Sequence, residues 1–249
     1  MDLGLRGKRA AVAAGSAGLG LGCAKALAAE GVQVSLCGRD RAKAEAAAAD
    51  IGAVALMADM SDVDQATGFI EQASERLGGT IDIVVANAGG PPAGTFASTD
   101  LDGYRQALEL NLLSSIALCR AAVPAMQAQR WGRVVAITSI GVRQPPPYLM
   151  ASATARAGLT AFLKVLATEV APDGVTVNSA QPGMHDTDRV RQLHGGETPP
   201  GEAAAGIPVG HLGDADDFGA VVAFLCSQQA RFVTGTSLLV DGGAFPGLV

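Results

Sequence analysis

The chain has 249 residues, of which 49% are hydrophobic and 17% charged, and this balance excludes a disordered, collagen-like or disulfide-scaffold protein. The 18 basic and 24 acidic residues give a net charge of -6, and no run of lysines or arginines could neutralise a nucleic-acid backbone. Nucleic acid is therefore not an expected partner. Single α/β domains often reach this length, so we expect one domain over residues 1–249.

The cysteines are scattered, and none belongs to a CxxC pair or has a histidine at metal-ligand spacing: Cys23, Cys37, Cys119 and Cys226. We expect them to be buried thiols of a cytoplasmic protein, and we predict no metal site. An uncharged stretch at residues 10–24 follows basic residues and imitates a signal peptide. It is rich in glycine and too short to cross a bilayer, so we expect no membrane segment.

Short apolar runs alternate with longer alanine- or leucine-rich helical patterns along the chain. Strands are predicted at residues 9–13, 33–37, 54–57, 81–86, 133–138, 176–179 and 237–240. Helices are predicted at residues 18–30, 41–50, 62–76, 101–129, 152–170 and 215–226, with Ser61 and Asp214 as capping residues. The alternation is typical of βαβ units. It predicts the α/β fold class: a single-domain, doubly wound parallel sheet of the Rossmann type, with helices on both faces.

Two segments interrupt the helical patterns. Residues 144–147 end in three consecutive prolines, and residues 194–210 are rich in glycine and proline. Neither segment can be regular helix throughout. We predict that residues 194–210 form a substrate lid within the single domain.

The loop after the first predicted strand has the composition of a dinucleotide-binding turn. It reads Ala-Gly-Ser-Ala-Gly-Leu-Gly over residues 14–20 and opens directly into a helix. Small residues let the backbone turn tightly, and the free N–H groups of a helix N-terminus favour a pyrophosphate. The candidate cofactor-binding residues of this loop are Gly15, Ser16, Gly18, Leu19 and Gly20. A glycine-rich turn needed only for packing is the alternative.

The second predicted strand is followed by Arg39, with no acid available to bind a ribose 2′-hydroxyl. A guanidinium suits a 2′-phosphate, and Ser16 is a second candidate ligand for that phosphate. The pattern therefore favours NADP(H) over NAD(H) as the cofactor. A solvated surface arginine is the alternative interpretation of Arg39.

Further motifs follow the later predicted strands: Asp59 and Met60, the segment Asn87-Ala88-Gly89, Asn111 in the long helix, Ser139 after an Ile-Thr pair, and Pro182-Gly183 followed by Thr187. Together with the glycine loop they resemble the short-chain dehydrogenase/reductase family, especially its 3-oxoacyl-ACP-reductase-like members, over nearly the whole chain. The resemblance implies that Asp59 meets the adenine and that Pro182-Gly183 face the nicotinamide. It also implies catalytic roles for Asn111 and Ser139.

The cofactor end departs mildly from the family pattern. Ala13 and Ala14 stand where the family usually has Thr-Gly, and Ala86 replaces the first Asn of its NNAG segment. Ala14 adds a methyl group beside the cofactor and is free of strain only at negative φ. We expect weaker cofactor binding, but not its loss.

The catalytic end departs more strongly, because the family's chemistry rests on a Tyr-x-x-x-Lys motif. Alignment through Ala157 and Gly158 puts Ser152 at the tyrosine position and Arg156 at the lysine position. These positions are one helical turn apart and face the same side. Serine does not titrate usefully as an acid. Arg156 can still bind ribose hydroxyls and offer positive charge, but its high pKa prevents it from relaying protons.

Other groups are candidate proton sources. Tyr148 lies four residues before Ser152 and could replace the missing phenol, or could merely pack at the mouth of the cleft. Ser139 could polarise an oxygen while water supplies the proton. His185 lies two residues after Gly183, and we expect it to be a loop histidine rather than an acid.

Two functions remain open. The first is an NADP(H)-dependent oxidoreductase that transfers hydride to or from a small carbonyl, enone or imine through an atypical active site. The second is a cofactor-binding protein without redox activity, either a partner subunit or a redox-neutral catalyst. The resemblance also implies a homotetramer, built through the long helices and the C-terminal strand region.

Overall fold

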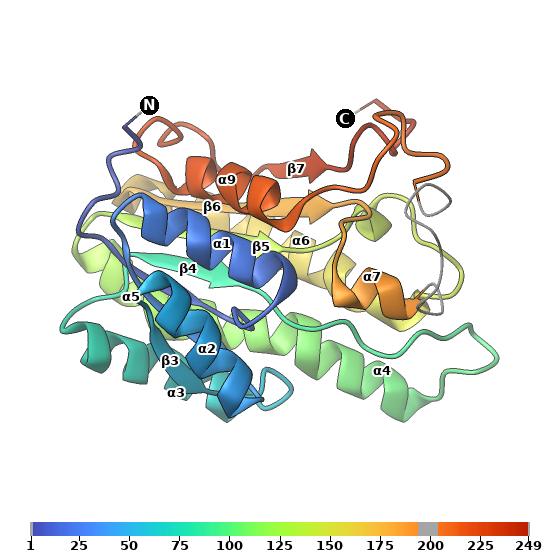
Figure 1. Ribbon diagram of the computed structural model, residues 1–249, viewed down its shortest axis with the longest axis horizontal. Helices are drawn as coiled ribbons and strands as arrows, with labels where there is room; N and C mark the ends of the chain where they lie inside the picture. The colour runs from blue at the N-terminus through green and yellow to red at the C-terminus, as the bar shows by residue number, and fades with distance from the viewer. Residues whose placement is uncertain (1, 194–203, 249) are drawn as a thin grey trace.

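The computed structural model describes residues 2–193 and 204–248, which form one seven-stranded parallel sheet between two layers of helices (Figure 1). The strands lie in the order β3-β2-β1-β4-β5-β6-β7. Their bounds are Arg9–Val12 (β1), Gln33–Gly38 (β2), Val54–Met57 (β3), Ile83–Ala86 (β4), Gly132–Ile137 (β5), Val175–Pro182 (β6) and Ser237–Val240 (β7). The predicted α/β class and doubly wound parallel sheet are confirmed.

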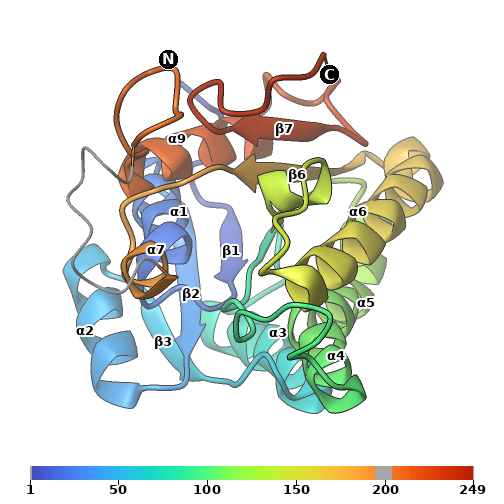
Figure 2. The same cartoon turned by 90° about the vertical axis from the view of Figure 1, so that its right-hand side faces the viewer.

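Helices cover both faces of the sheet (Figure 2). Their bounds are Gly18–Ala29 (α1), Arg41–Ile51 (α2), Val63–Leu77 (α3), Leu101–Leu108 (α4), Ser114–Ala128 (α5), Met150–Val170 (α6), Asp188–Leu193 (α7) and Ala215–Cys226 (α9). On one face α1, α2 and α9 pack over a buried cluster that includes Leu27, Leu36 and Phe218. On the other face α3, α5 and α6 pack over a cluster that includes Phe69 and Met126. Both faces are therefore buried, as the continuous apolar strands require.

All strands are parallel, but the side of the sheet on which the chain adds new strands changes between β1 and β4. From β1 the chain moves outward through β2 and β3, and it then returns to β4 on the other side of β1. The connections after β1 and β4 consequently leave the sheet in opposite directions, which opens a crevice at the carboxyl ends of the strands. This end is the right-hand side of Figure 1, toward which β6 and β7 point.

The strand ends differ from prediction for local reasons. β1 ends at Val12 rather than at residue 13, and the next turn places Ala14 in the left-handed region at φ 45°. β6 continues to Pro182 rather than ending at residue 179, because it pairs with β5 on one side and with β7 on the other. The longer strand carries Pro182 directly to the carboxyl edge.

The helix starts also test the predicted caps. The prediction of Ser61 as the cap of α3 is wrong, since the carboxylate of Asp62 accepts hydrogen bonds from the N–H groups of Asp64 and Gln65. An aspartate one residue further on outcompetes the serine because its oxygen reaches both free donors. The cap at Asp214 is confirmed, since its carboxylate accepts from two N–H groups at the start of α9.

The long helix predicted at residues 101–129 is present, but its middle is a π-helical turn. Residues Glu109–Leu113 form this turn between α4 and α5, and Asn111 lies inside it. Such turns often occur at functional sites, because the extra residue redirects side chains. By length and hydropathy alone, Leu101–Ala128 would suffice to cross a membrane, but half of its apolar window is buried inside the protein. Burial against the fold accounts for that apolar character.

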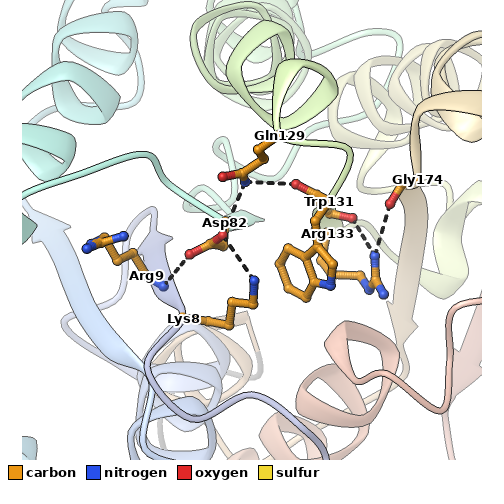
Figure 3. A network of polar contacts seen from close by, with 8 residues as sticks. Lys8, Arg9, Asp82, Gln129, Trp131, Arg133 and Gly174 are labelled. Atoms are coloured by element: carbon orange, nitrogen blue, oxygen red, sulfur yellow. Dashed lines mark hydrogen bonds and ion pairs between the residues drawn. The ribbon is translucent and has the colours of Figure 1, made fainter.

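A polar network closes the amino end of the sheet, opposite the crevice (Figure 3). The carboxylate of Asp82 accepts hydrogen bonds from the backbone N–H of Arg9 at 2.9 Å and from Gln129 Nε2 at 3.1 Å. Lys8 Nζ lies 3.5 Å from the same carboxylate and 3.8 Å from the centre of the Trp131 ring. These contacts join the starts of β1, β4 and β5, and their polar groups are paired with one another at this end of the sheet.

The four cysteines are buried and unpaired, as the sequence predicts. Burial raises the pKa of Cys37, Cys119 and Cys226 to about 12 and raises that of Cys23 further still. Thiols with such pKa values remain protonated at neutral pH and are poor nucleophiles. The cysteines therefore act as small core side chains.

Candidate active site

A cleft of about 1310 Å³ lies at the carboxyl ends of the strands. Pockets that hold one small ligand usually measure roughly 300–1,000 Å³, so this cleft has room for a cofactor and a substrate. The predicted site residues that line it are Ser16, Gly18, Leu19, Arg39, Asp59, Met60, Asn87, Ala88, Gly89, Ser139, Tyr148, Ser152, Arg156, Pro182, Gly183 and Thr187. Gly15, Gly20 and Asn111 lie behind this lining and shape it.

The glycine loop joins β1 to α1 along one wall of the cleft. A side chain at Gly20 would collide with the carbonyl oxygen of Ala14 and the amide of Asn87, and Gly18 has φ 54°. Among the described residues, no side chain caps the start of α1, whose N-cap residue is Ala17. The free N–H groups and the helix dipole there fit a pyrophosphate. These features support the predicted cofactor loop.

Ala14 is strained at the start of this loop. Its φ of 45° falls in the region that L-residues with a Cβ atom rarely adopt. Asn87 Nδ2 donates a hydrogen bond to the Ala14 carbonyl at 3.2 Å and helps to hold the turn. The backbone therefore keeps the glycine-type conformation although the residue is alanine.

Ala14→Gly is expected to raise the free energy of unfolding by about 0.5–1 kcal/mol, because it removes the left-handed strain of a Cβ atom. Chemical denaturation of both proteins measures the difference. Ala13→Gly is the matched control, since Ala13 is buried and is not among the positive-φ residues. The control should lose stability. A loss with Ala14→Gly as well would contradict the strain.

The predicted 2′-phosphate site lies at the ends of β2 and β3. Arg39 follows β2, its side chain is 77% exposed, and its Nη1 lies 4.0 Å from Oδ2 of Asp59. Ser16 is close by, because the position of a Cβ on Gly38 would lie 2.6 Å from the Ser16 hydroxyl. The loose ion pair leaves the guanidinium free to turn toward a phosphate.

Asn111 supports the loop after β4 from behind. Its Nδ2 donates a hydrogen bond of 2.9 Å to the carbonyl of Gly89, and its side chain is buried. Its Oδ1 is buried without a hydrogen-bond partner among the described residues. Gly89 has open space where a side chain would lie. The π turn thus places Asn111 to position the Asn87–Gly89 segment at the cleft wall.

Ser139, Ser152 and Arg156 line the cleft where the end of β5 meets α6. Arg156 Nε donates to Ser152 Oγ at 3.3 Å, and its Nη1 donates to the carbonyls of Ile137 at 2.8 Å and Thr138 at 3.1 Å. These bonds tie α6 to the end of β5. Ser139 follows that strand, and its hydroxyl accepts from the N–H of Gly141 at 2.9 Å, which leaves its own proton available for donation.

Burial and, to a smaller extent, the positive charge of Arg189 lower the pKa of Arg156 to about 10. A group with that pKa remains protonated at neutral pH. Arg156 is therefore a fixed cation that binds and orients neighbouring groups. It has no proton to give at the pH where a catalytic lysine would act.

Tyr148 lies at the mouth of the cleft, and its side chain is 47% exposed. Its backbone carbonyl accepts a hydrogen bond from Gly94 N at 2.8 Å, which anchors the residue just before α6. Its phenol makes no hydrogen bond to any residue that the structure describes. The hydroxyl is thus accessible to a molecule entering the cleft.

His185 is a packing residue. It is buried, and its ring meets Phe218 edge-on with centroids 5.2 Å apart. Burial lowers its pKa, so the ring is neutral near pH 7. Its Nδ1 lies 3.3 Å from the carbonyl of Gly183. The expectation of a loop histidine agrees with this placement.

Helix α7 was not predicted, and it brings an additional cation to the site. Thr187 lies just before α7 and close to the glycine loop, since a Cβ atom on Gly18 would be 3.5 Å from Cγ2 of Thr187. Arg189 on α7 also lines the cleft. No sequence signal marks Arg189, because a six-residue helix lacks a readable period.

The predicted lid at residues 194–210 falls partly outside the described residues, which resume at 204. The described part packs against the C-terminal segment: the backbone N–H of Val209 donates to the carbonyl of Gly242 at 3.2 Å. Ile207 is buried in this contact area and would touch a side chain on Gly242. Residues 204–210 do not line the cleft, whereas α7 does.

Comparisons with known proteins agree with this geometry. A family model described as Enoyl-(Acyl carrier protein) reductase matches residues 13–244. The 3-oxoacyl-[acyl-carrier-protein] reductase FabG of Escherichia coli is 33% identical, with 98% of this chain and 99% of that protein covered.

Solved structures are similar over almost the full length. A short chain dehydrogenase/reductase family protein is 34% identical with a TM-score of 0.89, covering 99% of this chain and 100% of that one. L-sorbose reductase from Gluconobacter frateurii, in complex with NADPH and L-sorbose, is 28% identical with a TM-score of 0.92, and both chains are covered completely. Its sheet order, its glycine loop and these matches show that the chain belongs to the short-chain dehydrogenase/reductase family of oxidoreductases, of which the L-sorbose reductase named here was solved with NADPH.

Proposed function

We propose that this protein is an NADP(H)-dependent oxidoreductase that transfers hydride to or from a small carbonyl, enone or imine. One observation carries the proposal: a single cleft is lined both by the glycine loop before α1 and by Ser139, Ser152 and Arg156. A cofactor along the loop would therefore present its reactive end to the serines. The alignment that places Ser152 and Arg156 at the family's tyrosine and lysine positions is part of the proposal.

In this proposal, positive charge, substrate orientation and proton supply come from different residues than in a Tyr-Lys pair. The nicotinamide cofactor, when bound, would supply or accept the hydride. Arg156 holds the end of β5 and presents a permanent positive charge to the cleft. Ser139 donates its proton in a hydrogen bond to the substrate oxygen and so orients it. Tyr148, or a water held near Ser139, provides the proton.

The cofactor preference in this proposal is for NADP(H), supported by the exposed Arg39 beside Ser16 and by the absence of an acid at the end of β2. The NADPH complex of the similar L-sorbose reductase is consistent with it. Asp59 and Met60 would flank the adenine, and Thr187 would reach the nicotinamide side.

Arg39→Ala is expected to weaken NADPH binding by about 1.5–3 kcal/mol, the usual contribution of a hydrogen bond to a charged group, and to leave NADH binding nearly unchanged. Calorimetry with both cofactors measures this. Arg41→Ala is the matched control, because Arg41 is an exposed neighbour that pairs with Glu45 at 3.2 Å and does not line the cleft. Equal losses for NADPH and NADH would contradict the assignment.

The second candidate function is a cofactor-binding protein without redox activity. It is favoured by one observation: Arg156 donates hydrogen bonds to Ser152 and to the carbonyls of Ile137 and Thr138, so the cation at the lysine position is held by the protein itself. The discriminating experiment measures NADPH consumption with a panel of activated carbonyls, enones and imines. Consumption with any of them supports the oxidoreductase. Binding of NADPH without consumption across the panel supports the second function.

We further propose that the protein works in the cytoplasm as a homotetramer on a small-molecule substrate. Unreactive buried thiols agree with a reducing compartment. Leu113 on the long helix, Val165 on α6 and Phe232 before β7 are exposed apolar side chains that an interface would cover. Light scattering at micromolar concentration should show four subunits, and a monomer there would contradict the assembly.

A further inference from the structure

Arg189 occupies an unusual position for a cation. Its Nη2 donates a hydrogen bond of 2.6 Å to the carbonyl of Pro91, across the cleft from its own helix α7. A Cβ atom on Gly90 would lie 2.7 Å from its Nε, so the guanidinium rests directly on the backbone after β4. The side chain is half-buried, and burial lowers its pKa. A partly desolvated cation that donates to one carbonyl still has donors to offer.

Among the residues that the structure describes, the catalytic end of the cleft holds two cations, Arg156 and Arg189, and no acid paired with either. Arg156 is close enough that the charge of Arg189 depresses its pKa. Over residues 2–193 and 204–248, neither arginine makes an ion pair. The acids that line the cleft face other cations: Asp59 faces Arg39, Asp186 and Asp188 face Arg191, and Asp216 faces Lys25. A buried cation beside a half-buried one, with no ion pair to either among the described residues, favours an anionic ligand.

The position of Arg189 points to the substrate rather than to the cofactor. The proposed cofactor's phosphates have their own partners, at the start of α1 and at Arg39. The loop that begins at Pro91 instead runs toward the catalytic helix, since Gly94 forms a bridge with Leu149 just before α6. Arg189 therefore contacts the wall that continues to Tyr148 and Ser152.

We propose that the substrate is a small oxo or enone carboxylate, and that Arg189 binds its carboxylate while the reacting oxygen faces Ser139. This inference rests on the proposed oxidoreductase function and narrows its substrate class. A guanidinium and a carboxylate match in charge and planar shape, which fixes orientation as well as affinity. Arg156 supplies the positive charge that stabilises the negative charge developing on the reacting oxygen.

The experiment measures binding without turnover. The protein is saturated with NADP⁺, which cannot reduce a carbonyl, and is titrated calorimetrically with pyruvate or β-acetylacrylate and with the methyl ester of each. At least one acid should bind about 10- to 150-fold more tightly than its ester. Arg189→Met should abolish this preference, and Arg189→Lys should restore part of it. Arg191→Met on the same helix should retain it, because Arg191 is exposed and pairs with Asp186 and Asp188.

Equal binding of acid and ester, or no binding of either, overturns the inference. So does an Arg189→Met protein that loses NADP⁺ affinity but keeps the preference for the acid, because the guanidinium would then serve the cofactor. An acid preference that depends on Arg189 supports the inference even where NADPH is never consumed. That last result would contradict the oxidoreductase alone, so the two proposals fail separately.

Discussion

Ser152→Tyr combined with Arg156→Lys is expected to raise the rate of NADPH oxidation with a simple activated ketone by about 10²- to 10⁴-fold, the usual contribution of general acid catalysis. The two positions already touch, since Arg156 Nε donates to Ser152 Oγ at 3.3 Å, and both line the cleft with Ser139. A phenol at 152 would add the missing proton donor. A lysine at 156 would restore the family's Tyr-x-x-x-Lys pair, in which the cation lowers the phenol's pKa and can also relay a proton.

Each single variant is a control and should gain little. Tyrosine alone would face a cation that cannot relay a proton, and lysine alone would have no phenol to assist. Calorimetry must show unchanged NADPH binding, and thermal denaturation must show a folded protein, because Arg156 also holds the carbonyls of Ile137 and Thr138. A folded double variant that binds NADPH yet gains no activity would contradict a reductase site that lacks only its acid.

If the Tyr148 phenol gives the proton, Tyr148→Phe lowers turnover of the best substrate in the panel by at least ~10², and if the phenol only packs, turnover hardly changes. The residue is half-exposed, and its hydroxyl makes no hydrogen bond to the described parts of the chain, so the change costs little stability. Steady-state kinetics with NADPH in excess measures the effect on kcat.

The other tyrosine offers the matched control. Tyr104 packs from α4 against the small buried cluster of Ala107, Ala151 and Ala155, and it does not line the cleft. Tyr104→Phe should leave kcat within about twofold. Unchanged turnover in Tyr148→Phe would show that the phenol only packs, and the proton would then come from a water near Ser139.

Much of the geometry of the glycine loop could be predicted because its signals are local. Glycine at 18 and 20 is required by a positive φ and by a close backbone approach, and both demands act within a few residues of the chain. Arg39 follows its strand directly. The cap at Asp214 likewise needs only the N–H groups two and three residues further on.

The catalytic half could be only partly predicted, because its decisive contacts are long-range. That Ser152 and Arg156 share a helix face follows from helix geometry alone. That Arg156 is buried against the end of β5 depends on the packing of α6. The π turn that buries Asn111 and the edge contact that buries His185 against Phe218 are likewise products of packing between distant segments.

The sequence by itself determined the order of strands and helices, the parallel sheet and the glycine loop after β1, because apolar periodicity and turn chemistry are properties of neighbouring residues. Only the tertiary structure decided which charged side chains line the cleft and which distant segments they contact. Arg189 lies on an unpredicted short helix and reaches Pro91, 98 positions earlier in the chain. Residues 204–210 pack on the C-terminal segment instead of lining the cleft. Both outcomes depend on where the chain returns in space, which no local pattern encodes.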